Sequence, residues 1–284
     1  MDFSVTTRRL RCILRKCVRA ILGKTIVFDR HGLQTLLAYR VSGEIVRDLN
    51  LPIPFEYERN SVIGEVLFYK GGFEEREIAA VCEILRRTAK PVVLDIGANV
   101  GWHSVRWAVG CPDSQIYAFE PAVGTAALLK TNALLNRVGA RVKHVAYAVS
   151  DKEGIAEFHE CEDSAYSSLK DTRRKKVIST THVPVTTVDR FVEEEDITRL
   201  ALIKIDVEGL ETEVLRGSLK TLETLGPDVF VEIYGGEASN LNPEDTIRQM
   251  KSLGYEALVW KDEGLVPHVS HSDRYFNYLF SKKQ

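Results

Sequence analysis

The strongest constraint on the fold is an alternation, from residue 91 onward, of short apolar runs with longer segments of helical pattern. The predicted strands are PVVLDIG, QIYAFEP, VKHVAYAVS, ALIKIDVEG, DVFVEIY, YEALVW and RYFNYLFS, and the predicted helices include LETEVLRGSLKTLETLG as one continuous element. Strands that alternate with helices indicate a mostly parallel sheet covered on both faces. The runs VVLDI, ALIKI and DVFVEI are apolar enough to be buried on both sides. The sequence therefore predicts an α/β fold.

The first of these strands ends in a loop that predicts a ligand site. In the stretch VVLDIGANVGWHS, Asp95 ends the strand, and Gly97 and Gly101 lie in the loop. Ligands of open parallel sheets bind beyond the carboxyl ends of the strands, and glycine lets the backbone approach them closely. A nicotinamide dinucleotide site usually has G-x-G-x-x-G facing a pyrophosphate, but Asn99 replaces the middle glycine here and Asp95 would repel phosphate. S-adenosylmethionine, which carries a sulfonium and an ammonium group and no phosphate, fits this loop better.

The second strand supports the same ligand. It ends in YAFEP, which places Glu120 at its tip, 19 residues after Gly101. An acid at that position can accept hydrogen bonds from both hydroxyls of a ribose. A glycine loop followed by an acid at the end of the next strand is a much more specific signal than the loop alone.

Three stretches carry a resemblance to a known family: LDIGANVGWHS, YAFEP followed by LLKTNALLN, and TTVDRFV with ALIKIDVEGLETEVLRG. Over about residues 62–284 the chain resembles the FkbM-type family of S-adenosylmethionine-dependent methyltransferases. The resemblance implies a class I methyltransferase (Rossmann-like) fold with a seven-stranded, mostly parallel sheet whose last strand is antiparallel. It implies that the cofactor site is formed by Asp95, Ile96, Gly97, Ala98, Asn99, Gly101, Glu120, Pro121 and Asp206, with Ser150 and Asp151 near the adenine.

Members of this family are expected to methylate hydroxyl groups, often on sugars or natural products. We therefore expect an O-methyltransferase that acts on a hydroxyl of a sugar, glycan or glycosylated metabolite. Two alternatives stay open: methylation of a macrolide or other natural product, and a non-catalytic module that only binds S-adenosylmethionine. The acceptor pocket is formed by loops, and Ser167 and Ser168 in the polar segment 159–180 are either part of it or ordinary loop residues.

A hydroxyl is a poor nucleophile at neutral pH, so a base or a metal ion should help to remove its proton. Lys204, Asp206 and Glu208 alternate along one strand and therefore begin on one side of it. Glu232 lies at the corresponding end of a strand that is expected to be adjacent, and His103 follows the glycine loop. These five residues are the catalytic candidates. Asp206 and Glu232 are also suited to hold Mg²⁺ or Mn²⁺ through carboxylate oxygens, or to pair with the lysine instead.

The N-terminal residues differ from the rest of the chain. Residues 1–24 carry seven basic side chains and one acidic one, although the net charge of the protein is −2. The apolar spacing within residues 8–22 predicts a helix with one apolar and one basic face. Such a helix either lies on an anionic membrane surface or packs on its own domain with the basic face in water. We expect two parts: an N-terminal basic helical extension over residues 1–61 and a methyltransferase domain over residues 62–284.

Composition excludes several classes of protein. The net charge of −2 gives no sign of nucleic-acid binding. The five cysteines are scattered and form no Cys-x-x-Cys pair, so we expect a reduced, cytoplasmic setting without a disulfide framework or zinc site. No apolar run approaches the ~20 residues that a membrane span requires. The expected partner is a small-molecule or glycan acceptor, with peripheral membrane contact through residues 1–24 as an open alternative.

Overall fold

The computed structural model describes residues 25–28, 35–42, 45–233, 243–261, 264–272 and 274–282. The helix predicted within residues 8–22 lies outside the described residues. The chain forms two compact units, residues 1–73 and residues 74–284. The boundary between residues 61 and 62, which rests on the family resemblance, stays a prediction. No helix within the described residues is long and apolar enough to cross a membrane.

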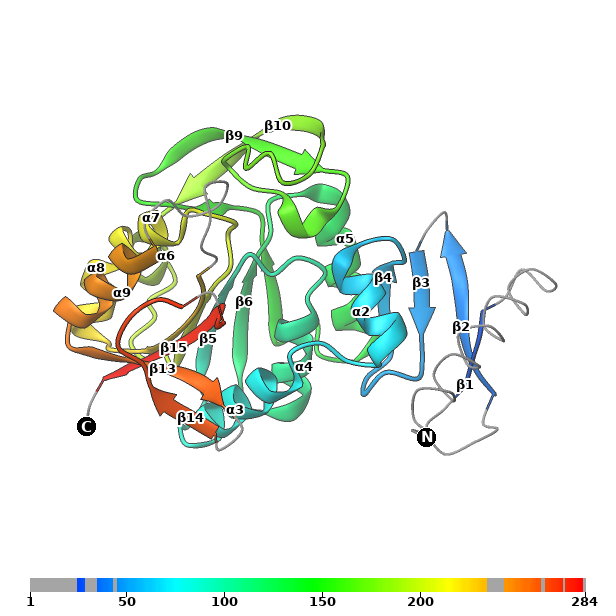
Figure 1. Cartoon of the computed structure of the whole chain (residues 1–284), viewed down its shortest axis with the longest axis horizontal. Helices are drawn as coiled ribbons and strands as arrows, with labels where there is room; N and C mark the ends of the chain where they lie inside the picture. Colours follow the sequence, from blue (N-terminus) through cyan, green and yellow to red (C-terminus); the bar gives the residue numbers. More distant parts are fainter. Residues whose placement is uncertain are drawn as a thin grey trace. The chain divides into compact units, whose positions relative to one another are not determined.

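The described part of the N-terminal unit is an antiparallel sheet followed by a helix (Figure 1). The strands lie in the order β1 (Thr25–Phe28), β2 (Thr35–Ser42), β3 (Ile45–Asp48) and β4 (Phe55–Glu58). The helix α2 (Val62–Lys70) begins at Ser61, whose hydroxyl accepts a hydrogen bond from the Gly64 N–H at 3.0 Å. A serine in this position satisfies one of the free N–H groups of the first helical turn.

The C-terminal unit contains the predicted α/β sheet. Its strands lie in the order β14 (Gly264–Pro267), β13 (Tyr255–Lys261), β15 (Asn277–Lys282), β12 (Asp228–Glu232), β11 (Leu202–Ile205), β5 (Val92–Ile96), β6 (Gln115–Phe119) and β7 (Val142–Val145). The pairs from β12 to β7 are parallel, and β15 is antiparallel to both of its neighbours. The predicted antiparallel last strand is therefore confirmed. The short strand β14 extends the seven predicted strands to eight.

Helices cover both faces of this sheet (Figure 1). One layer contains α3 (Glu75–Arg86), α4 (Trp102–Gly110) and α5 (Val123–Leu135); the other contains α6 (Val188–Glu194), α7 (Glu211–Arg216), α8 (Leu219–Thr224) and α9 (Pro243–Ser252). The second layer packs on a core that includes Ile203, Ile205 and Val229, all fully buried. Burial on both sides explains why these strands are apolar throughout.

The segment predicted as one helix over residues 210–226 forms two helices, α7 and α8. The break lies at Gly217 and Ser218. A Cβ at Gly217 would lie 2.2 Å from the carbonyl oxygen of Ser150, so the backbone passes another loop too closely for any side chain. The Ser218 hydroxyl donates to the Val214 carbonyl at 2.6 Å, which satisfies a carbonyl at the end of α7.

A small second sheet lies beside the carboxyl edge of the main sheet (Figure 1). Its strands are in the order β8 (Ala148–Val149), β10 (Val177–Thr186) and β9 (Gly154–Cys161), and β9 and β10 form an antiparallel hairpin. Phe158, Val183 and Val185 form its apolar core together with Ala122 and Ala148. The segment 159–180, predicted as an exposed loop, is thus the outer half of a hairpin with the short helix η1 (Ser164–Tyr166) in its turn.

Candidate active site

The glycine loop after β5 has the backbone geometry that its residues favour. Gly97, Asn99 and Gly101 all have positive φ angles, of 78°, 48° and 84°. Asparagine is one of the few residues other than glycine that adopt this region readily, and the Asn99 Oδ1 accepts a hydrogen bond from the Val100 N–H at 2.7 Å. A Cβ at Gly97 would lie 1.8 Å from the carbonyl oxygen of Asp206. The loop therefore turns directly over the end of β11.

Glu120 closes the other side of this loop. Its carboxylate accepts hydrogen bonds from the Asn99 N–H at 3.1 Å and the Ala122 N–H at 2.8 Å. Burial raises the pKa of Glu120 to about 7, and these two N–H groups oppose the rise. Each carboxylate oxygen has a second lone pair, so both can still accept a hydroxyl hydrogen bond from a ligand.

A pocket open to solvent lies between the glycine loop, the second strand and the hairpin. Its polar walls include Gly97, Glu120 and Asp206, and its apolar walls include Phe119, Val149, Phe158, Val207 and Leu210. Ile96 and Pro121 also line it, as do Ser167 and Ser168 from the hairpin. A pocket with apolar walls and a few convergent polar groups is typical of a small-molecule site.

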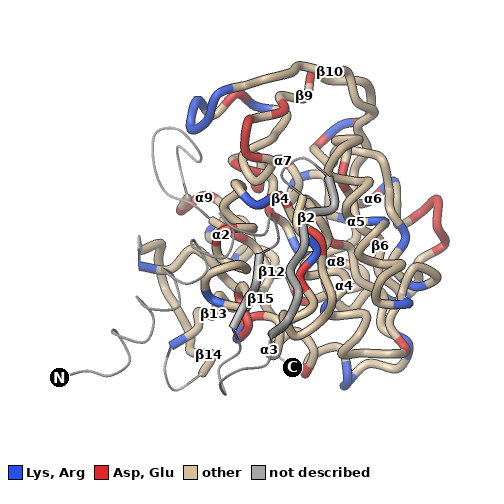
Figure 2. Tube along the Cα trace, turned by 90° about the vertical axis from the view of Figure 1, so that its right-hand side faces the viewer, with Lys and Arg blue, Asp and Glu red and all other residues tan. Residues whose placement is uncertain are grey.

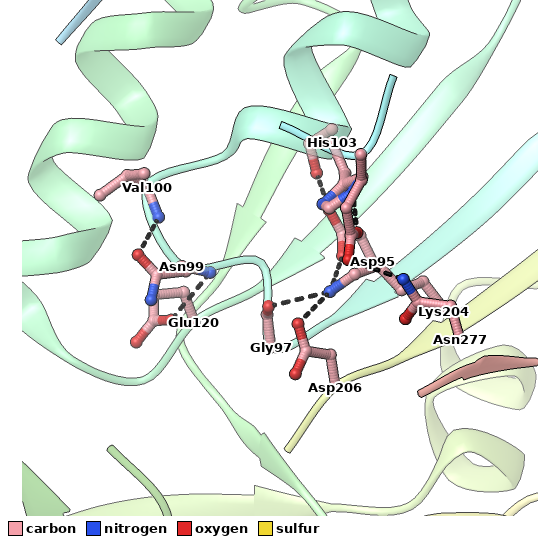
Figure 3. A network of polar contacts seen from close by, with 11 residues as sticks. Asp95, Gly97, Asn99, Val100, His103, Glu120, Lys204, Asp206 and Asn277 are labelled. Carbon is pink, nitrogen blue, oxygen red and sulfur yellow. Dashed lines mark hydrogen bonds and ion pairs between the residues drawn. The ribbon is translucent and has the colours of Figure 1, made fainter. Parts of the chain in front are cut away.

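The Lys204 ammonium group contacts the glycine loop and acids at the ends of β5 and β11. β11 and β5 are parallel, with Lys204 in register beside Asp95, so both side chains emerge on the same face. The Lys204 Nζ lies 3.4 Å from Asp95, 3.0 Å from Asp206 and 3.3 Å from the Gly97 carbonyl oxygen, and Figure 3 shows this group. Burial alone would lower the pKa of Lys204, but the negative charges of Asp206 and Asp95 outweigh it and raise the pKa.

The Asp95 side chain is buried, whereas direct contact with a ligand requires an exposed surface. Its side chain is fully buried and accepts a hydrogen bond of 2.5 Å from the Ser104 hydroxyl. The acids that line the pocket are Glu120 and Asp206, and the Asp206 side chain is 31% exposed. The predicted contact of Asp95 with the cofactor therefore stays a prediction, and its role in this structure is to anchor Lys204.

Three carboxylates converge at the end of β11, as the alternation along the strand predicts. The register places Ile205 beside Val231, so the residues that follow them, Asp206 and Glu232, lie at the same edge of the sheet. Ligand atoms of Asp206, Glu208 and Glu232 lie within 4.8 Å of one another. Glu208 has a left-handed backbone (φ 57°) and forms a short ion pair with Arg174.

The three acids titrate differently. Burial and the negative charge of Asp206 raise the pKa of Glu208 to about 8, although Arg174 opposes the rise. Burial and the same neighbouring charge raise the pKa of Glu232 well above its usual range. Burial alone would raise the pKa of Asp206, but Lys204 and a hydrogen bond from Glu232 outweigh it and lower the pKa. The pKa values of the neighbouring Asp206 and Glu232 are therefore shifted in opposite directions.

His103 belongs to a contact that the sequence analysis did not predict. Its Nε2 lies 2.9 Å from the Glu74 carboxylate, which also accepts a hydrogen bond of 2.7 Å from the Asn277 side chain. Burial would raise the pKa of Glu74, but the hydrogen bond and charge of His103 and the Asn277 hydrogen bond outweigh it and lower the pKa. The left-handed backbone of Glu74 (φ 49°) is unusual for glutamate and is the signal that marks it.

Ser150 and Asp151 are not among the described residues that line the pocket. The Ser150 N–H donates to the Thr186 carbonyl at 3.0 Å, and Asp151 lies 3.3 Å from the Arg216 guanidinium. The pocket wall on this side consists of Tyr147, Ala148 and Val149. The prediction that Ser150 and Asp151 lie near an adenine is not tested by these contacts.

From β7 to β14, the strand order places β5, the strand that precedes the glycine loop, inside the sheet between β6 and β11, and the antiparallel strand β15 between β12 and β13. This order, with one antiparallel strand between the last two parallel ones, defines the class I fold of S-adenosylmethionine-dependent methyltransferases. A sequence model described as the methyltransferase FkbM domain matches residues 95–257, and the chain belongs to this family. The family resemblance and the fold predicted from it are confirmed.

Two relatives and one solved structure illustrate the range of similar proteins. The hexuronic acid methyltransferase AglP of Haloferax volcanii is 28% identical over 159 residues, covering 55% of this chain and 60% of that protein. The 31-O-demethyl-FK506 methyltransferase FkbM of Streptomyces tacrolimicus is 31% identical over 159 residues, covering 44% and 58%. The chain thus spans about three fifths of the length of each relative. The crystal structure of methyltransferase FkbM from Methylobacillus flagellatus has 14% identity and a TM-score of 0.45, covering 68% of this chain and 44% of that one.

Proposed function

We propose that the protein is an S-adenosylmethionine-dependent O-methyltransferase that acts on a hydroxyl of a sugar, glycan or glycosylated metabolite. The observation that carries the proposal is the pocket bounded by Gly97, Glu120 and Asp206, with the acidic cluster at its end. Membership of a methyltransferase family supports the reaction type. A relative named for its action on hexuronic acid supports a saccharide acceptor.

The pocket residues fit the proposed cofactor. Glu120 would accept hydrogen bonds from the ribose hydroxyls, and the apolar wall with Phe158 and Val149 would pack against the purine. The crowding at Gly97 brings the loop backbone and Asp206 together, which would place both beside the amino-acid end. When bound, S-adenosylmethionine supplies the methyl group that is transferred.

The acidic cluster would activate the acceptor. A general base works best when its pKa is close to the operating pH, and Glu208, with a pKa of about 8, meets this condition. Ionised Asp206 would accept a hydrogen bond from the acceptor hydroxyl and hold it in line. Lys204 fixes Asp206 in place, so it is a positioning residue.

A divalent cation is the second candidate for activating the hydroxyl. Asp206, Glu208 and Glu232 are close enough together to share one ion, and carboxylate oxygens suit Mg²⁺ or Mn²⁺. Lys204 and Arg174, however, already place two positive charges against Asp206 and Glu208. We therefore favour base catalysis without a metal. Undiminished turnover in EDTA is the expected result, and activity restored only by Mg²⁺ or Mn²⁺ would favour the metal instead.

The proposal is tested by a screen of saccharides, glycolipids and macrolides with a radiolabelled methyl donor. Label transferred to a saccharide hydroxyl by the wild-type protein, and lost in Asp206→Ala without loss of cofactor binding, is the expected result. Transfer only to macrolides would replace the saccharide acceptor. Cofactor binding without transfer to any acceptor would favour the non-catalytic module.

A further inference from the structure

The turn between β9 and β10, residues 162–176, concentrates positive charge in a chain of net charge −2. We call it the basic turn: it has five basic side chains, Lys170, Arg173, Arg174, Lys175 and Lys176, against three acidic ones, Glu162, Asp163 and Asp171. Two of its acids are engaged locally. Asp163 caps η1 by accepting from the Ala165 N–H, and Asp171 accepts from the Arg173 N–H at 2.9 Å. Figure 2 shows lysine and arginine gathered at this end of the hairpin.

The basic turn is attached to the candidate active site at three points. The Ser168 hydroxyl donates to the Val207 carbonyl at 2.8 Å, directly after β11. The Ser164 hydroxyl lies 3.4 Å from the Asn99 side chain in the glycine loop. Arg174 forms its short ion pair with Glu208 in the acidic cluster. These contacts hold the turn against the site, next to the acidic cluster where the acceptor is proposed to react.

Arg174 and Lys175 are held close together by one aromatic ring. The Arg174 guanidinium lies 4.5 Å from the centre of the Tyr166 ring, and the Lys175 ammonium lies 5.6 Å from it. Both contacts are cation–π interactions. Two cations on one ring repel each other, and the carboxylate of Glu208 offsets only one charge. The arrangement therefore maintains a positive potential beside the site.

An open groove runs along this part of the turn. Four basic side chains line it, Arg173, Arg174, Lys175 and Lys176, together with two acidic ones, Glu162 and Asp171, so the basic groups are in excess. Arg173 and Lys176 are exposed, whereas Arg174 is half-buried and also contacts the acidic cluster. Arg174 thus belongs to the groove and to the candidate active site at once. An arginine fixed by a ring and a carboxylate is already ordered before an anion binds, so binding would cost little conformational entropy.

We propose that this groove binds an anionic group of the acceptor, a carboxylate or a phosphate, while the reacting hydroxyl lies at the acidic cluster. This inference rests on the proposed O-methyltransferase function. The carboxylate of Asp206 in the acidic cluster would repel an anion, so a charged group has to lie away from the reacting hydroxyl. The groove is adjacent and has the opposite charge. We therefore expect the protein to prefer an acidic saccharide over its neutral counterpart.

The test compares three acceptors: p-nitrophenyl glucuronide, p-nitrophenyl glucoside and glucose 6-phosphate. The groove variant is Lys175→Gln/Lys176→Gln, and the matched control is Lys130→Gln/Lys220→Gln, which removes two exposed charges from α5 and α8. We expect the KM of an anionic acceptor to rise about tenfold in the groove variant with kcat retained. The KM of the glucoside and the behaviour of the control variant should not change. A KM that rises for the glucuronide identifies a carboxylate as the bound group, and a KM that rises for glucose 6-phosphate identifies a phosphate.

A binding measurement separates this inference from the proposed function. Glucuronide and glucose 6-phosphate are titrated calorimetrically into the wild-type protein and the groove variant, with a melting curve to confirm that the variant is folded. Anion binding that weakens in the groove variant, without methyl transfer to any acceptor, supports the groove and refutes the proposed function. Methyl transfer to the glucoside with no preference for either anion refutes the groove and leaves the function. Absence of anion binding in the wild-type protein overturns the inference whatever the activity.

Discussion

Replacing Lys204 with methionine should destabilise the C-terminal unit strongly. The substitution removes the ammonium group that lies 3.4 Å from Asp95, whose side chain has no exposed surface, and leaves the Ser104 hydrogen bond in place. Removing one partner of a buried ion pair costs about 3–5 kcal/mol because the other charge stays buried without compensation. Asp206 contributes less to this loss, since its side chain is 31% exposed and water replaces part of the lost interaction. We therefore expect the free energy of unfolding to fall by about 3–5 kcal/mol at pH 7.

Urea unfolding followed by tryptophan fluorescence measures this loss, because all three tryptophans lie in residues 74–284. The pKa of Asp206 is lowered in the folded protein, so its pairing stabilises above the unfolded pKa of about 3.8 and is lost as the pH falls below it. The difference between wild type and variant should therefore shrink from pH 7 toward pH 3. Adding Asp95→Asn to Lys204→Met should recover part of the loss. A decrease in the free energy of unfolding that is smaller than about 1 kcal/mol, or an equal decrease at both pH values, would refute the reasoning.

Three further predictions concern the site, and a fourth concerns the N-terminal residues. Gly97→Ala should abolish cofactor binding measured by calorimetry, because its Cβ would lie 1.8 Å from a backbone oxygen at a φ of 78°; wild-type affinity would contradict this geometry. Methyl transfer should increase as the pH rises through about 8, where Glu208 ionises, and Glu208→Gln should flatten the profile; an unchanged profile would remove Glu208 as the base. Glu74→Gln should lower kcat about tenfold or more with little change in KM, since it withdraws the charge that orients His103; unchanged kcat would make the contact purely structural. Deletion of residues 1–24 should reduce sedimentation with anionic liposomes, whereas equal sedimentation of both forms would refute the membrane interpretation.

The parts of the site that lie within one motif, or at the ends of neighbouring strands, could be predicted from the sequence. Asp206 and Glu232 were expected to be neighbours because acids at the ends of adjacent parallel strands meet at one edge, and their carboxylates do lie close together. The glycine loop was predictable because its residue types determine its backbone angles. Asn99 fits a position that glycine usually occupies because asparagine also tolerates a positive φ.

Contacts between distant segments could not be predicted. Asn277 and Glu74 are separated by 203 residues, and Arg174 and Glu208 by 34, so only the folded chain brings them together. The break between α7 and α8 depends on the close approach of Gly217 to Ser150, which no helical periodicity reveals. Strand β4 does carry a local signal, because Phe55 and Tyr57 alternate with Glu56 and Glu58 along it.

The most direct test of the account is calorimetric titration with S-adenosylmethionine and, separately, with NAD. We expect micromolar binding of S-adenosylmethionine, no binding of NAD, and at least a tenfold loss of affinity in Glu120→Ala, where a charged hydrogen-bond acceptor for the ribose is removed. Binding of NAD alone, or binding of S-adenosylmethionine that is indifferent to Glu120, would contradict the assignment of the cofactor to the carboxyl edge of β5 and β6.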